Sequence, residues 1–339
     1  MNDPIDIKTK KVIPAQQTEK FDRFLVLQNL QQHIVSHYDT WGSFQQSWTN
    51  KAYKTFKDFD KYIVMMFLVR NYWQSLSDKF SYLSMDEFYD LENVKIDKIN
   101  LINISQELNI PKETIRRKVN ELQEAGILIR DGKSILFNKR GMNYQKPENT
   151  IELVSTFIAK KSNLLQGNAW FGESISKEEV QKFINKYFTI IWLRFFKLQI
   201  PFLIRHRNTF QDLETWIVWG NIALNQQAQM NKARDKDLLF ENVNRTNYYS
   251  NMAHTKVARG INASSIADIS QIPRATVIRK LKWLMKNDII KKNKNLEYQL
   301  KPSGKIHSMI SKNTVINQEA VSDFLTDVFD YMKNSNFKL

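Results

Sequence analysis

Apolar residues recur at helical spacing along most of the chain, and the most regular pattern lies in Ile261–Leu300. A short apolar helix and a turn come first. Pro273 then suits the first turn of a second helix, because the N–H that proline lacks would be unpaired there anyway. Val277, Leu281 and Leu284 recur at i, i+4 and i+7, which predicts that one stripe of this second helix is buried.

The opposite face of the second predicted helix is polar and basic. Its side chains that could reach a partner are Arg274, Ala275, Thr276, Arg279 and Lys282. Ile289-Ile290 and Leu296–Leu300 are predicted as the strands of a hairpin whose connection holds Lys291, Lys292 and Lys294. A basic helix face beside a basic hairpin is what a winged helix-turn-helix needs to enter a major groove and contact the flanking phosphates.

The same pattern occurs earlier in the chain, at an offset of 162 residues. Ile99–Leu128 aligns without a gap with Ile261–Ile290, and a hairpin with Asp131-Gly132 in its turn follows. Asp-Gly favours a two-residue turn because both positions need positive φ. The identical pairs include Asn100/Asn262, Pro111/Pro273, Thr114/Thr276, Arg117/Arg279 and Lys118/Lys280. Because several of these are not core residue types, apolar spacing alone does not explain the match.

The helix before each pattern is also similar. Thr55–Val64 resembles Thr209–Val218, so the predicted repeat includes the preceding helix. In the first copy, the residues predicted to face DNA are Lys112, Glu113, Thr114, Arg116 and Arg117, with Lys133 in the hairpin.

These residues resemble the winged-helix transcription regulators of bacteria, most nearly those of the MarR type. The resemblance rests on the run from Pro273 to Leu284, on the strand pair after it, and on Leu300–Lys305 as the lead-in to a closing helix. It covers about 40 residues in each half of the chain. Such regulators are usually homodimers with one winged helix per chain, whereas this chain carries two predicted units.

The predicted fold is therefore mainly α with small β-hairpin wings, built from two winged helix-turn-helix units in an internal repeat, as a fused pseudo-dimer. The expected order begins with a mobile tail (1–20), a helical segment with the first winged helix (21–140, the winged helix at 98–140) and a linker (141–150). A second helical segment (151–339) then holds the second winged helix (259–301) and a C-terminal helix (316–333).

Four further segments have more specific expectations. Phe56–Leu76 is a strongly apolar predicted helix, and Lys177–Ile204 is predicted as a helix kinked or broken near Pro201. Trp41–Tyr53 is predicted as a loop or short helix, and Met230–Val257 as a long surface loop.

Charge supports a polyanionic partner. The chain has a formal net charge of +15. Residues 98–140 hold nine Lys/Arg and five Asp/Glu, and 259–301 hold ten and three, so these two segments contribute +11 of the +15. A general lysine bias would spread the charge more evenly. We expect the partner to be double-stranded DNA.

Contacts with DNA follow from the side-chain chemistry. Arg117 and Arg279 lie opposite the buried stripes, where an arginine can bind a guanine edge through two hydrogen bonds. Thr114 and Thr276 suit a phosphate or a thymine methyl, and Glu113 suits a cytosine amino group. A fused pair can read two unlike half-sites, about 34 Å apart in successive major grooves. The rival interpretation is one reading head, the second unit, with the first used for assembly.

Enzymatic functions find no support in the sequence. The chain has no cysteine, which excludes disulfides and suits a reducing cytoplasm. It contains no phosphate-binding or dinucleotide-binding glycine loop and no His-Glu-x-x-His, and we expect no cofactor, no metal and no membrane span. His33 and His37, four residues apart, are predicted as a surface or packed pair rather than half a metal site.

Two alternative classes of protein stay open. A replication initiator with two winged helices in one chain would also fit. A ligand-responsive repressor would place an effector among the aromatic helices around Trp73, Trp192, Trp216 and Trp219, although aromatic side chains at this spacing usually fill a core.

Overall fold

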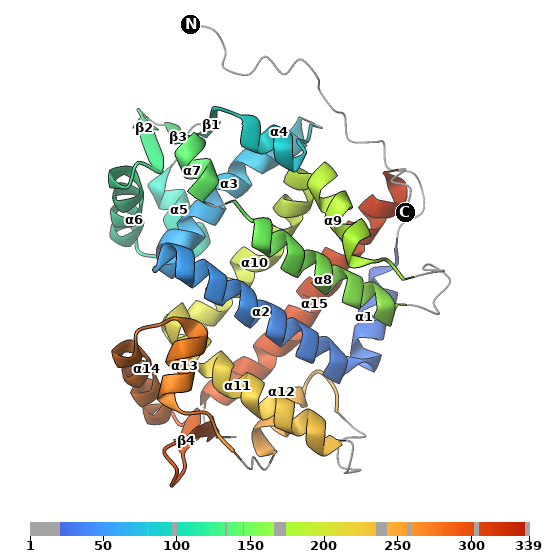
Figure 1. Ribbon diagram of the computed structural model, residues 1–339, viewed down its shortest axis with the longest axis vertical. Helices are drawn as coiled ribbons and strands as arrows, with labels where there is room; N and C mark the ends of the chain where they lie inside the picture. The colour runs from blue at the N-terminus through green and yellow to red at the C-terminus, as the bar shows by residue number, and fades with distance from the viewer. Residues whose placement is uncertain are drawn as a thin grey trace, which may run out of the picture.

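The computed structural model describes residues 21–79, 81–96, 100–132, 134–144, 146–165, 174–234, 243–255, 259–301 and 305–335. Figure 1 shows a mainly helical molecule with two small β-hairpins. The predicted tail (1–20), Lys98 and Lys133 lie outside the described residues. The mainly α class with small hairpins is confirmed.

The elements of the first half surround the first hairpin. They are α1 (Arg23–Gln32), α2 (Ile34–Phe56), α3 (Phe59–Asp78), α4 (Met85–Asp90), β1 (Asn93–Ile96), α5 (Leu101–Leu108), α6 (Lys112–Glu124), β2 (Leu128–Asp131), β3 (Ser134–Asn138) and α7 (Lys139–Tyr144).

The second half contains the longer central helices and the second hairpin. Its elements are α8 (Glu148–Leu164), α9 (Lys177–Lys186), α10 (Phe188–Phe210), α11 (Leu213–Arg234), α12 (Tyr248–His254), α13 (Ala263–Ser270), α14 (Arg274–Lys286), β4 (Ile290–Lys292), β5 (Tyr298–Leu300) and α15 (Lys305–Asn334).

One central helix organises the core. α10 is apolar around most of its circumference, and such a helix must be covered on all sides. It packs against α3, α11 and α15, and most of its side chains are buried. Figure 1 shows α2, α10 and α15 crossing the middle of the molecule between the two hairpin regions. The apolar contacts of both halves therefore belong to one continuous core.

The sequence predicts no membrane span. Within the described residues, no single helix has the length and apolar character for one. Only α9 and α10 taken together meet that test, as a pair bent by 105°.

Each hairpin belongs to a helix-turn-helix with a wing. In the first unit, β1, β3 and β2 form a three-stranded antiparallel sheet in that order. In the second, β4 pairs with β5, and an isolated bridge joins Ile261 to Tyr298 where β1 lies in the first. α13 and α14 begin and end 162 residues after α5 and α6.

Local chemistry explains several identical pairs. Asn100 and Asn262 are the N-caps of α5 and α13, where each side chain accepts a backbone hydrogen bond that the helix leaves unmade. Asn109 and Gln271, also 162 residues apart, both end the first helix of the motif in the left-handed conformation. Pro111 and Pro273 are the N-caps of α6 and α14, one residue before the predicted position.

An equivalent ion pair ties each second helix to the helical body. The Nζ atom of Lys118 lies 2.6 Å from Oδ2 of Asp58, the N-cap of α3. Lys280 makes the same contact with Asp212, which precedes α11 and whose side chain accepts a hydrogen bond from the backbone N–H of Thr215. Each aspartate thus caps one helix and holds the lysine of another.

Electrostatics favour the charged form of the first lysine. Burial opposes the charge on Lys118, but Asp58 and Glu121 outweigh that effect and hold the pKa of the ammonium above its usual value.

Several sequence-based expectations about elements are wrong. Trp41–Tyr53 lies within α2, which stays helical because its aromatic side chains are buried. The helix predicted over Lys177–Ile204 breaks at Tyr187 rather than at Pro201, which lies inside α10. The expected linker 141–150 contains the end of α7 and the start of α8, and Gly141 is packed against the Ile127 carbonyl.

Three boundaries also differ. The C-terminal helix, expected at 316–333, is α15 and begins at Lys305. The predicted loop Met230–Val257 includes the end of α11 and all of α12, whose Tyr248 and Met252 are buried. The first winged unit begins before residue 98, because β1 supplies a third strand at residues 93–96.

The double role of Asp58 predicts the effect of two substitutions. Asp58→Ala removes the cap and a partner of Lys118, and it should lower the opening free energy of α6 amides by about 2 kcal/mol. Asp58→Asn keeps a capping side chain and should cost about half as much. Native-state hydrogen exchange measures both values. Asp90→Ala, an exposed change at the end of α4, is the control, and unchanged α6 protection in Asp58→Ala would contradict the assigned role.

Candidate nucleic-acid interface

The second helices of the two motifs, α6 and α14, lie on the same side of the molecule. In Figure 1 both are at the left edge, α6 above and α14 below, with α2 between their levels. Each packs its apolar stripe inward: α6 on α3 and α14 on α11. Their other faces are open to solvent.

The exposed face of α14 is strongly cationic. The helix contains five basic residues and no acidic one. Lys280 is held by Asp212, but Arg279 and Lys282 are exposed and form no ion pair among the described residues. Arg274 is also exposed and donates to the hydroxyl of Ser264 at 3.2 Å. Because these charges are not neutralised within the protein, they are available to phosphates.

Thr276 lies beside these cations on α14 and is half-buried. Its counterpart on α6, Thr114, is half-buried too. Both threonines therefore sit at the edge of the exposed face, as the repeat predicts.

The exposed face of α6 is different because glutamates neutralise it. The helix has four basic and three acidic residues. Nη2 of Arg116 lies 2.7 Å from Oε2 of Glu113, and Nε of Arg117 lies 3.9 Å from Oε1 of Glu121. Only Lys112 among the predicted basic contacts of this helix is exposed and without an ion pair in the described structure. The first unit therefore offers phosphates much less unpaired positive charge.

Glu113 has a role that the sequence did not predict. We expected it to accept from a cytosine amino group, but in this structure its carboxylate is occupied by Arg116. Glutamate three residues before arginine on an exposed helix is a favourable pair, so this contact follows from spacing alone.

The wings also differ from the predicted pattern. Lys291 and Lys292 are exposed residues of β4 rather than of the turn, because Lys291 pairs with Gln299 and Lys292 with Tyr298. Lys294 is exposed in the connecting loop, as predicted. In the first wing, Asp131 pairs with Ser134 and belongs to β2, so it is not part of the turn as predicted.

Two basic residues near these faces were missed. Arg130 is exposed on β2, where its Nε donates to the Gly132 carbonyl at 3.3 Å, and Lys286 is exposed in the last turn of α14. Strand alternation gave no signal for Arg130, because it places this residue on the same face as the buried Leu128. Lys286 extends the helical stripe of Arg279 and Lys282.

Candidate metal ligands do not come together in the described part of the chain. Within the described ranges, no group of three or more His, Asp or Glu side chains could hold a metal ion. His33 is exposed and His37 is fully buried, so the two do not face a common site. Burial, and secondarily Lys161, lowers the pKa of His37 well below its usual value.

Comparison with known protein families gives a match that lies in the first unit. Residues 94–133 match the DeoR-like helix-turn-helix domain. This range runs from β1 across α5, α6 and β2, and it supports a DNA-binding helix-turn-helix of the kind found in transcription regulators. Searches of curated proteins and of solved structures found no significant match to the chain.

The Glu113–Arg116 pair predicts an effect on non-specific binding. Glu113→Gln removes the carboxylate that holds Arg116, so affinity for a random duplex at low salt should rise about three- to tenfold, and the salt slope should steepen by up to about 1. Fluorescence anisotropy across a salt series measures both. Glu124→Gln changes the net charge equally at an exposed position of α6, and equal effects of the two variants would show that only net charge matters.

Proposed function

We propose that this protein is a sequence-specific regulator of transcription that binds double-stranded DNA through two unequal winged helix-turn-helix units in one chain. The observation that carries the proposal is the placement of α6 and α14 on one side of a shared helical body (Figure 1). A duplex lying along that side would meet both helices. The DNA-binding class rests on the DeoR-like match, and the two half-sites are our extension of it.

We further infer that the two units descend from one duplicated ancestor. Three features support this: the equal bounds of the helices at an offset of 162 residues, the shared left-handed turn, and the equivalent Asp58–Lys118 and Asp212–Lys280 ion pairs. Two random helix-turn-helix motifs would share the apolar stripe, but they would have no reason to share a polar tie to a preceding helix. The chain would then be a pseudo-dimer, able to bind as a monomer.

The units differ in electrostatics, and so we assign them different tasks. α14, with Lys291, Lys292 and Lys294 in its wing region, would supply most of the phosphate contacts and guanine readout through Arg279. α6 would read its half-site with weaker electrostatic attraction, since its arginines must leave their glutamates first. An asymmetric operator with one dominant half-site follows from this difference.

We also propose the narrower resemblance to MarR-type regulators. It rests on Pro273–Leu284 and on the residues after the second wing, which the DeoR-like match does not cover. Both types use the second helix of the motif in the major groove, so the proposed contacts do not depend on the choice between them.

Binding to selected duplexes tests whether Arg117 and Arg279 contact bases. After selection of preferred sequences from a random pool, Arg279→Ala should weaken binding to the preferred duplex by about tenfold or more and lower its preference over a scrambled one, because a bidentate guanine contact contributes about 1–3 kcal/mol. Arg117→Ala should act in the same direction but less. Arg23→Ala is the matched control, because Arg23 lies on α1, outside both helix-turn-helix units.

Hydroxyl-radical footprinting then separates two heads from one. Two engaged units protect two backbone regions about one helical turn apart, and Arg117→Ala weakens only one of them. A single protected region, unaffected by Arg117→Ala, would reduce the proposal to one reading head. No preference for any duplex over its scrambled version would overturn sequence-specific binding.

A further inference from the structure

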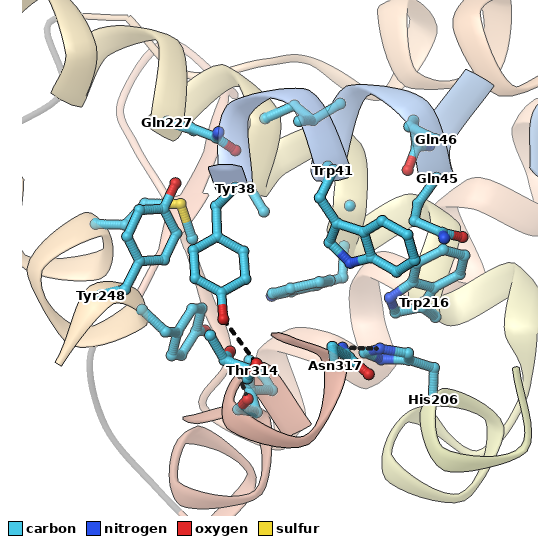
Figure 2. A pocket seen from close by; sticks show the side chains of 18 of the residues that line it. Tyr38, Trp41, Gln45, Gln46, His206, Trp216, Gln227, Tyr248, Thr314 and Asn317 are labelled. Atoms are coloured by element: carbon cyan, nitrogen blue, oxygen red, sulfur yellow. Dashed lines mark hydrogen bonds between the residues drawn. The ribbon is translucent and has the colours of Figure 1, made fainter. Parts of the chain in front are cut away.

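A cavity with aromatic walls lies beside the second unit, between α2, α10, α11, α12 and α15. Its volume is about 100 Å³. Figure 2 shows Tyr38 and Trp41 entering from α2, Trp216 and His206 at the right of the view, and Tyr248 of α12 at the left. Two of the four tryptophans expected around an effector, Trp216 and Trp219, line it; Trp73 and Trp192 instead pack against Phe188 in the core.

The walls hold one another in place. Trp41 and Trp216 both meet Phe202 edge-on, with ring centroids 5.4 Å apart in each case. The His206 ring lies 5.1 Å from that of Trp216. The Tyr38 hydroxyl is anchored on the Thr314 carbonyl at 2.7 Å (Figure 2). Such a box presents flat ring faces at fixed positions, which suits a planar guest.

The hydrogen-bonding state of His206 follows from its neighbours. Arg205 donates to Oδ1 of Asn317 at 2.7 Å, so the Nδ2 amide group of Asn317 faces Nε2 of His206, 3.2 Å away. Since the amide nitrogen can only donate, Nε2 must accept, and the neutral ring carries its proton on Nδ1. Burial, reinforced by the charge of Arg205, lowers the pKa of His206 to about 3, so the ring stays neutral.

Three buried N–H donors at this cavity have no hydrogen-bond partner in the described structure. They are Nδ1 of His206, Nε1 of Trp216 and Nε1 of Trp219, on side chains that are 5%, 4% and 9% exposed. The carbonyl oxygen of Gln45, a further lining residue, is also unpaired there. A buried donor without an acceptor costs about 1–3 kcal/mol. Three such donors at one cavity therefore favour a ligand that supplies an acceptor.

The charge of the lining residues and the volume of the cavity further limit which ligands can bind. The lining includes no Asp, Glu, Lys or Arg among the described residues. An ion placed there would lose hydration without gaining a partner, so a neutral guest is favoured. The volume is of the order of the ~150 Å³ cavity that holds benzene, which allows one ring.

We propose that this cavity is a binding site for a neutral, single-ring nitrogen heterocycle whose ring nitrogen accepts a hydrogen bond from the Trp216 indole. The same helix that supplies Trp216, Trp219 and Gly220 packs against α13, α14 and β5. A ligand held there thus contacts the helix that supports the second winged unit. The binding step itself does not depend on the proposed DNA function.

Pyridine and benzene are the probes, because they have the same shape and differ in one acceptor atom. Binding is followed without DNA, on full-length protein labelled with ¹⁵N at its eight tryptophans, through the indole N–H resonances. Pyridine should bind about tenfold more tightly than benzene, the gain of one hydrogen bond in a buried site, and it should shift the Trp216 indole resonance downfield. No binding of either probe, or equal binding of both, would overturn the proposal.

Two variants check where the probes bind. Trp216→Phe keeps a ring but deletes the donor, so the preference for pyridine should fall while benzene still binds. Ala223→Leu places a larger side chain in the cavity wall and should weaken both probes by about tenfold or more. Lys312→Ala, an exposed change on α15, is the control, and unchanged pyridine binding in both cavity variants would place the probe elsewhere and refute the site.

Discussion

The contact on which the arrangement of both units depends is the ion pair between an N-cap aspartate and a lysine of the second helix. Apolar stripes on α6 and α14 bring each helix to its neighbour, but such packing tolerates small rotations. A lysine that must meet one carboxylate at the start of α3 or α11 defines a single rotation. Rotation matters here because it decides which side chains of α6 and α14 face solvent. Through this tie, the helical body determines the direction in which Arg117 and Arg279 point.

The same tie explains why the charge of a helix is a poor guide to its exposed surface. In the sequence, Lys118 and Lys280 look like two more basic residues that could contact DNA. In the structure each forms an ion pair within its own unit. On α6, Glu113 and Glu121 also engage the arginines, so little of its formal positive charge reaches a partner unpaired. On α14 no acidic residue does so. Both helices have the same fold, but α6 contains acidic residues that satisfy its arginines within the protein, and α14 contains none.

The two helix-turn-helix motifs were predictable because their signals are local: N-cap asparagines, apolar stripes and a fixed offset. The surrounding helices were not. Trp41–Tyr53 is rich in polar residues and forms part of a long helix only because neighbouring helices bury its aromatic side chains, which is tertiary information. Pro201 signalled a break, but the buried surroundings of α10 keep that helix continuous. The ion pairs on α6 could have been read from i, i+3 spacing, whereas the pairing of Lys118 with Asp58 depends on the docking of α3.

A body that holds α6 and α14 at a fixed separation also makes them responsive to changes in that body. α11 is buried on one side against α2 and α10, and on the other it supports α13, α14 and β5. Gln226 on this helix bridges further: its Nε2 donates to the carbonyls that end α12, and its Oε1 accepts from the backbone N–H of Leu300 at 3.3 Å. β5 and α14 therefore rest on the same helix, α11. Close-packed cores transmit displacement rather than absorb it, and α11 also contributes side chains to the aromatic cavity.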